Sequence, residues 1–238
     1  PTEDIDKPVS FILDTDDLVL KAGEKGIISL IFYTEKGKPM GYYFNPISQI
    51  NLTCGSNEEI EYNVLLGKNY GQYSIAISSI HDIEGTCTVK AIEKSQNFTL
   101  KVIPNKVNNC KLSSVSPPQA VAGELYSINF LCYDEYGNEA HLIDGEFGAL
   151  ITDEDGQKVE YDINLDEGNK HNLYILPKKS GAYKIKSLYL KEEITVDTLP
   201  GEVSPENSYL EIQNNTKAGQ EIEINIHVFD KYGNKAKL

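Results

Sequence analysis

Apolar and polar residues alternate along several short segments of the chain. A period of two places one face of a β-strand against a core and leaves the other face in solvent. Clusters of Gly, Asn, Asp and Pro separate these segments, as turns require, and no window of a dozen residues carries a helical stripe. The pattern predicts an all-β chain, and it is clearest at Tyr126, Ile128, Phe130 and Cys132 and again at Ile222, Ile224, Ile226 and Val228.

The segments recur in the same order at a spacing of about 96 to 100 residues. The turn Asp-Glu-Tyr-Gly-Asn at residues 134–138 returns as Asp-Lys-Tyr-Gly-Asn at residues 230–234. A fixed period of this size indicates a tandem array of small domains and not one large enzyme fold. An Ala-Gly pair marks each copy ahead of its turn, at Gly23, Gly123 and Gly219.

The period divides the chain into a divergent first repeat at residues 1–104, a second repeat at 105–200 and the start of a third at 201–238. A domain of about 95 residues with about seven short strands has the size of an immunoglobulin-like sandwich. The third repeat stops after its Gly-Asn turn, and two strands cannot bury a core. We therefore expect the chain to be a piece of a longer protein.

The order of motifs resembles the filamin-type immunoglobulin repeat. That order is Ala-Gly, strand, Asp-x-x-Gly-Asn, strand, Gly-x-Tyr-x-Ile, strand and Pro-Gly. Repeat one is looser, because Cys87 stands where the family has Tyr and Lys38-Pro39 follows the turn glycine. The resemblance is to a scaffold and not to a ligand site, and repeat two carries it at Ala122-Gly123, 134–138, 181–185 and Pro200-Gly201.

The resemblance implies a place where a protein partner would bind. Filamin repeats accept ligands along the face of two neighbouring strands, and an open sandwich edge offers unpaired backbone groups for an added strand. The matching stretches in repeat one are residues 50–54 and 60–64, where a glycan on Asn51 would block the groove. The candidate partner-binding residues of repeat two are Phe147, Leu150, Val159, Tyr161 and Ile163.

Each complete repeat contains two of the four cysteines. Cys54 and Cys87 fall on strands that are antiparallel neighbours in such a sandwich, and Cys110 and Cys132 fall on the first two strands of repeat two. We predict one disulfide within each repeat. The alternative is four free, buried thiols in a cytosolic protein.

Three sequons for N-linked glycosylation favour the same compartment. Asn97 alternates with Phe98 and should face outward, and Asn214 precedes an Ala-Gly turn. Together with paired cysteines they predict an extracellular or cell-surface location, as the ectodomain of a membrane-anchored protein, although the sequence holds no signal peptide and no apolar span of 18 residues. The sequons begin at Asn51, Asn97 and Asn214.

Charge and motifs exclude several functions. The chain has 22 Lys and Arg against 36 Asp and Glu, a net charge of −14, so it lacks the basic surface that nucleic acids or anionic membranes need. Acidic clusters at residues 14–17 and 153–155 have no EF-hand spacing. The four histidines are scattered, and no zinc, phosphate-loop or nucleophile-elbow motif occurs. We expect no catalysis, no metal and no cofactor.

These observations predict a non-enzymatic adhesion or recognition ectodomain that binds a protein partner through a sandwich face or an edge strand. The filamin resemblance implies a link to the gamete surface proteins of plants and protists that mediate gamete attachment. Two alternatives stay open: an intracellular actin-crosslinking or ciliary scaffold, and a carbohydrate-binding accessory domain. The chain contains no tryptophan that could form a sugar-binding platform.

Overall fold

The computed structural model describes residues 7–40, 49–55, 60–69, 71–143, 147–165, 170–212 and 218–237. These residues form strands, turns and bends, with no α-helix among them, which confirms the all-β prediction. The chain divides into two compact units. Unit 1 comprises residues 1–105 and 136–138, and unit 2 comprises residues 106–135 and 139–238.

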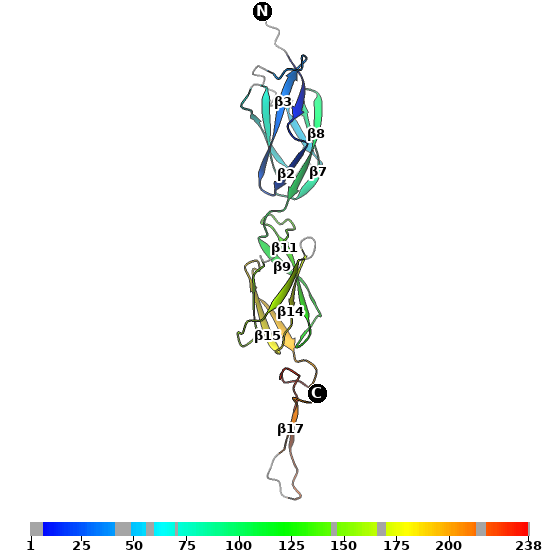
Figure 1. Ribbon diagram of the computed structural model, residues 1–238, viewed down its shortest axis with the longest axis vertical. Coiled ribbons are helices and arrows are strands. Elements are labelled where there is room, and N and C mark those ends of the chain that lie inside the picture. Colours follow the sequence, from blue (N-terminus) through cyan, green and yellow to red (C-terminus); the bar gives the residue numbers. More distant parts are fainter. Residues whose placement is uncertain are drawn as a thin grey trace, which may run out of the picture. The chain divides into compact units, whose positions relative to one another are not determined.

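Unit 1 is a sandwich of two four-stranded sheets (Figure 1). One sheet has the order β1-β3-β6-β5 and the other the order β2-β8-β7-β4. All neighbours are antiparallel except β2, which runs parallel to β8. The strands are β1 (Pro8–Leu13), β2 (Asp17–Lys21), β3 (Lys25–Thr34), β4 (Asn51–Cys54), β5 (Glu61–Leu66), β6 (Gln72–Ser78), β7 (Ile83–Ala91) and β8 (Lys94–Ile103).

Unit 2 repeats this topology. Its sheets have the orders β13-β14-β11-β9 and β10-β16-β15-β12, and β10 runs parallel to β16. The first two strands, β9 and β10, follow each other in the chain but join opposite sheets, which is an immunoglobulin-like arrangement. The strands are β9 (Asn109–Ser116), β10 (Ala120–Val121), β11 (Tyr126–Tyr133), β12 (Ala149–Thr152), β13 (Tyr161–Leu165), β14 (Lys170–Ile175), β15 (Gly181–Ser187) and β16 (Ile194–Leu199).

The alternating residues form the core of each sandwich. On β11 the predicted inward set is buried, with Ile128 and Phe130 at 0% exposure. On β3 the equivalent Ile28, Leu30 and Phe32 are also at 0%. Burial of a side chain of this size stabilises the folded state by roughly 1.5–3 kcal/mol. The period of two therefore accounts directly for the two cores.

A two-stranded sheet from the third repeat completes unit 2. It pairs β17 (Tyr209–Ile212) with β18 (Ile224–His227) in antiparallel register. Ile222, Ile224 and Ile226 align with the buried Tyr126, Ile128 and Phe130 at an offset of about 96 residues. They are nevertheless 54%, 52% and 59% exposed, because two strands supply no second layer to cover them.

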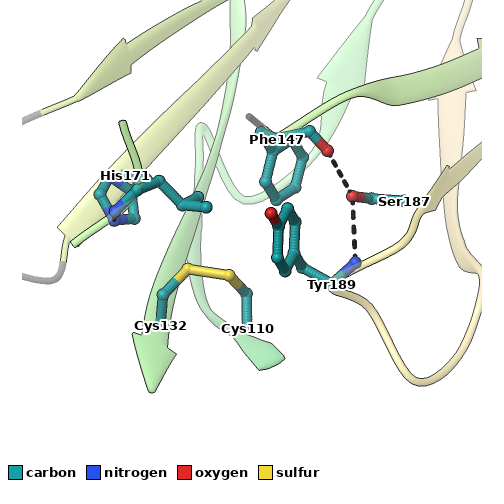
Figure 2. The surroundings of a disulfide bond; sticks show 7 residues. Cys110, Cys132, Phe147, His171, Ser187 and Tyr189 are labelled. Carbon is teal, nitrogen blue, oxygen red and sulfur yellow. Dashed lines mark hydrogen bonds between the residues drawn. A yellow bond between two sulfur atoms is a disulfide. The ribbon is translucent and has the colours of Figure 1, made fainter. Parts of the chain in front are cut away.

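Each of the first two repeats contains one disulfide between directly opposed residues of neighbouring strands. Cys54 on β4 bonds Cys87 on β7, and Cys110 on β9 bonds Cys132 on β11, with a Cα–Cα distance of 4.0 Å in both pairs. All four cysteines are buried. Figure 2 shows the Cys110–Cys132 bond beside the ring of Tyr189.

The Asp-x-x-Gly turns are held by their first residue. Asp153 Oδ1 accepts hydrogen bonds from the N–H groups of Asp155 and Gln157, at 3.1 and 2.8 Å, and Gly156 adopts a φ of 77° that favours glycine. Burial alone would raise the pKa of Asp153. The hydrogen bonds from Gln157, Lys179 and Asp155 together outweigh that effect and lower it, so these acidic residues serve the turn itself.

Candidate functional site

A groove of about 850 Å³ opens between the edge strands β12 and β13 of unit 2. β12 ends one sheet and β13 ends the other, so the groove lies where the two layers of the sandwich part. The residues that line it come from both strands, from the segment between them, from Tyr174 on β14 and from two flanking positions. They are Leu125, Ala149, Leu150, Ile151, Lys158, Val159, Glu160, Tyr161, Asp162, Tyr174 and Leu176.

Hydrogen bonds fix the walls of the groove. The Ala149 N–H donates to the phenolic oxygen of Tyr161 at 2.9 Å, which ties the start of β12 to β13. The Val159 N–H donates to the Ile151 carbonyl at 2.9 Å. The segment before β13 therefore covers part of the outer edge of β12, and β13 is the more open of the two strands.

The predicted binding residues do not all lie in the groove. Leu150, Val159 and Tyr161 line it. Phe147 instead lies in the core at 3% exposure, with its ring centroid 5.2 Å from that of Phe130. Phe147 precedes β12 and turns inward, so its side chain does not line the groove. Ile163 packs against the core from β13 and is absent from the groove lining.

The groove combines exposed apolar side chains with charges of both signs. Leu125, Leu150 and Leu176 are 60%, 44% and 45% exposed. Lys158, Glu160 and Asp162 are exposed beside them, in the same lining. An extended segment with an apolar side chain at alternate positions fits such an edge, because strand addition satisfies backbone groups while pockets accept every second side chain.

Sequence reasoning missed Leu125 and Leu176. Both lie just outside strands, Leu125 before β11 and Leu176 directly after β14. A single apolar residue at a strand end is common on protein surfaces, so the pattern carries no signal for them. Only the approach of the two sheet edges brings them next to Leu150.

The corresponding place in repeat one is smaller and differently closed. A cavity of about 280 Å³ lies there, lined by both Asn51 and Tyr62. The Tyr62 hydroxyl donates to Asn51 Oδ1 at 3.0 Å, which closes the wall with side chains. Asn51 is the first residue of a sequon and is exposed on β4. It aligns with Leu150, so repeat one has a sequon asparagine where repeat two has an apolar side chain.

Asn97 lies on β8 and is exposed, as its alternation with Phe98 predicted. Its Oδ1 accepts the hydroxyl of Thr88 at 2.9 Å. Asn214 lies outside the described residues.

Within the described residues no cluster of three or more His, Cys, Asp or Glu side chains is arranged to hold a metal ion. No helix in the described segments is long and apolar enough to cross a membrane.

Comparison with known proteins places the fold. No family model and no curated protein matches the sequence. Among solved structures, the chain is similar to FdeC, an adhesin of Escherichia coli, with a TM-score of 0.61 and 19% identity over 94% of this chain and 74% of that one. It is also similar to InvD of Yersinia pseudotuberculosis, with a TM-score of 0.58 and 13% identity over 95% of this chain and 71% of that one. The chain therefore has the fold of tandem immunoglobulin-like β-sandwiches.

Proposed function

We propose that this chain is a non-enzymatic adhesion or recognition ectodomain of a surface protein. It binds a protein partner at the groove between β12 and β13 of unit 2. The observation that supports this most directly is an open strand edge beside exposed leucines at 44–60% exposure. An edge of this kind pairs readily with a strand from another protein.

The sulfur chemistry supports a location outside the cell. All four cysteines are joined in pairs, and such bonds persist in oxidising compartments. A net charge of −14 keeps such a protein soluble and disfavours direct contact with anionic membranes. The likeness to a bacterial adhesin is a likeness of fold, and it is compatible with the same role.

The filamin-type resemblance supports a narrower form of the proposal. The three repeats, at 1–104, 105–200 and 201–238, would then be filamin-like modules, and attachment between gametes would be one function of this type. The turn at residues 134–138 and its copy at 230–234 carry that resemblance. The partner would be a protein on another cell or in the same surface complex.

A glycan placed in the groove should abolish partner binding. Leu150→Asn creates the sequon Asn-Ile-Thr at residues 150–152, which reproduces in repeat two the sequon that repeat one has at Asn51. We expect binding of the fluorescently labelled chain, produced in a eukaryotic secretory host, to intact cells of its source to fall at least about tenfold. Flow cytometry measures this, and mass spectrometry confirms the added glycan.

Leu112→Asn provides the matched control, because Leu112 is 49% exposed on β9, far from the groove in sheet order, and Ser114 completes its sequon. It should leave cell binding unchanged. Equal binding by the Leu150→Asn glycoform and the unaltered chain would rule out the groove as the partner site.

Intact mass under non-reducing conditions tests the surface location itself. In chain purified from its native source we expect both disulfides to be present and glycans to occupy Asn51 and Asn97, since both side chains are exposed on strands. Removal of N-linked glycans with an endoglycosidase should lower the mass accordingly. Four free thiols and unmodified asparagines would instead favour an intracellular scaffold.

A further inference from the structure

The Tyr-Gly-Asn turn of the third repeat (residues 232–234) contacts the connection between β14 and β15 of repeat two, within unit 2. Asn234 Nδ2 donates to the Lys178 carbonyl at 2.9 Å, and the Ser180 N–H donates to Asn234 Oδ1 at 2.9 Å. One side-chain amide thus satisfies a backbone acceptor and a backbone donor two residues apart. Because both partners are main-chain atoms, the contact does not depend on the side chains at positions 178 and 180.

The tyrosine of the turn requires a glycine opposite it. Gly123 has a φ of 90°, and a Cβ added there would lie 2.7 Å from Tyr232 Cε2. The Gly123 N–H donates to the Pro177 carbonyl at 2.7 Å. The hydroxyl of the buried Tyr183 bonds both the N–H and the carbonyl of Lys179, at 3.0 and 3.1 Å. These bonds hold Gly123 and residues 177–180 together as one backbone site, and none of them involves the turn.

Asp230 fixes the conformation of the turn that contacts this backbone site. Its carboxylate is at 0% exposure, and Oδ2 accepts Asn234 Nδ2 at 2.7 Å and the Gly201 N–H at 2.8 Å. Oδ1 accepts the N–H groups of Tyr232 and Asn234, both at 2.9 Å. Burial alone would raise the pKa of Asp230, but these hydrogen bonds together outweigh it and lower the pKa. The carboxylate is therefore ionised at neutral pH and can orient Asn234.

Unit 1, with which residues 136–138 group, contains the equivalent Asn and Tyr contacts. Asn138 Nδ2 donates to the Ile80 carbonyl at 2.8 Å, and the Asp82 N–H donates to Asn138 Oδ1 at 3.2 Å. A Cβ at Gly23 would collide with the ring of Tyr136. Ile80 and Asp82 share no chemistry with Lys178 and Ser180, so only the backbone atoms are common to the two sites.

We propose that the Asp-x-Tyr-Gly-Asn turn is a docking element for an adjoining repeat. Its partner is a sandwich of the same type that presents a glycine in an Ala-Gly turn beside a carbonyl and an N–H two residues apart. The turn of repeat one lacks the element, because Lys36 and Lys38 replace Tyr and Asn. The pair of motifs thus marks, from sequence, which repeats carry the docking element and which carry its partner site. This inference is independent of the groove and of the proposed function.

Amide hydrogen exchange on the full chain tests the element. Asn234→Ala removes the acceptor of the Ser180 N–H, so exchange at Ser180 should accelerate about tenfold or more, the equivalent of one ordinary hydrogen bond. Exchange of the β11 amides should not change. Tyr232→Phe keeps the ring over Gly123, and Lys38→Ala alters the turn that lacks the element, so both controls should leave Ser180 unchanged. Unaltered exchange at Ser180 in Asn234→Ala would overturn the proposal.

A second measurement covers the case in which Asn234→Ala loosens the whole of unit 2 and the β11 amides also exchange faster. Nuclear Overhauser contacts between the Asn234 side-chain amide and the Ser180 N–H are then sought in the unaltered chain. Their presence supports docking of the turn on the backbone site. Their absence rejects it, whatever the stability of the variant.

Discussion

Replacing Cys110 and Cys132 together by alanine is expected to lower the free energy of unfolding of unit 2 by about 3–4 kcal/mol. The bond closes a loop with a sequence separation of 22 residues, and its main effect is to restrict the unfolded chain. Loss of that restriction removes a large part of the free energy of unfolding of a typical domain, which is about 5–15 kcal/mol. Native-state hydrogen exchange of the slowest β11 amides measures the change in unit 2 separately from unit 1.

The first disulfide supplies the matched control. Cys54 and Cys87 span a separation of 33 residues, so their joint replacement should destabilise unit 1 by a similar amount. It should leave the β11 amides of unit 2 as they were. If the Cys110 and Cys132 double variant kept the exchange rates of the unaltered chain, the bond would not be a source of stability in unit 2.

Truncating Ile128 should have an effect of similar size. Ile128→Ala removes a side chain at 0% exposure from the middle of β11 and leaves a cavity that the surrounding sandwich fills only in part. We expect a loss of about 2–5 kcal/mol in the free energy of unfolding of unit 2, measured by the same exchange of β11 amides.

Ile224→Ala is the control for this prediction, because it changes the same residue at the same position of the next repeat. Ile224 is 52% exposed, so its truncation should alter stability by no more than about 0.5 kcal/mol. A similar loss in both variants would show that strand propensity, and not burial, sets the contribution of these isoleucines.

Part of the candidate site could be predicted from the sequence. The filamin resemblance implies a binding face that includes Leu150 and Tyr161, and these two residues lie on the edge strands β12 and β13. The alternation cannot say that Phe147 turns into the core, since that residue lies before the strand and its direction depends on contact with Phe130. Nor does it show that residues 158–159 cover β12 and leave β13 as the open edge, because that depends on non-local hydrogen bonds.

The sequence by itself determined the strands, the repeats and the spacing of the cysteine pairs, because a period of two and a period of about 96 residues are properties of the chain alone. Tertiary structure decided which of those patterns became a core. Ile128 and Ile224 have the same local pattern, yet one is buried and the other is half exposed. Burial requires a second sheet built from distant strands, and the same long-range packing forms the groove and brings Asn234 to the backbone of residues 178–180.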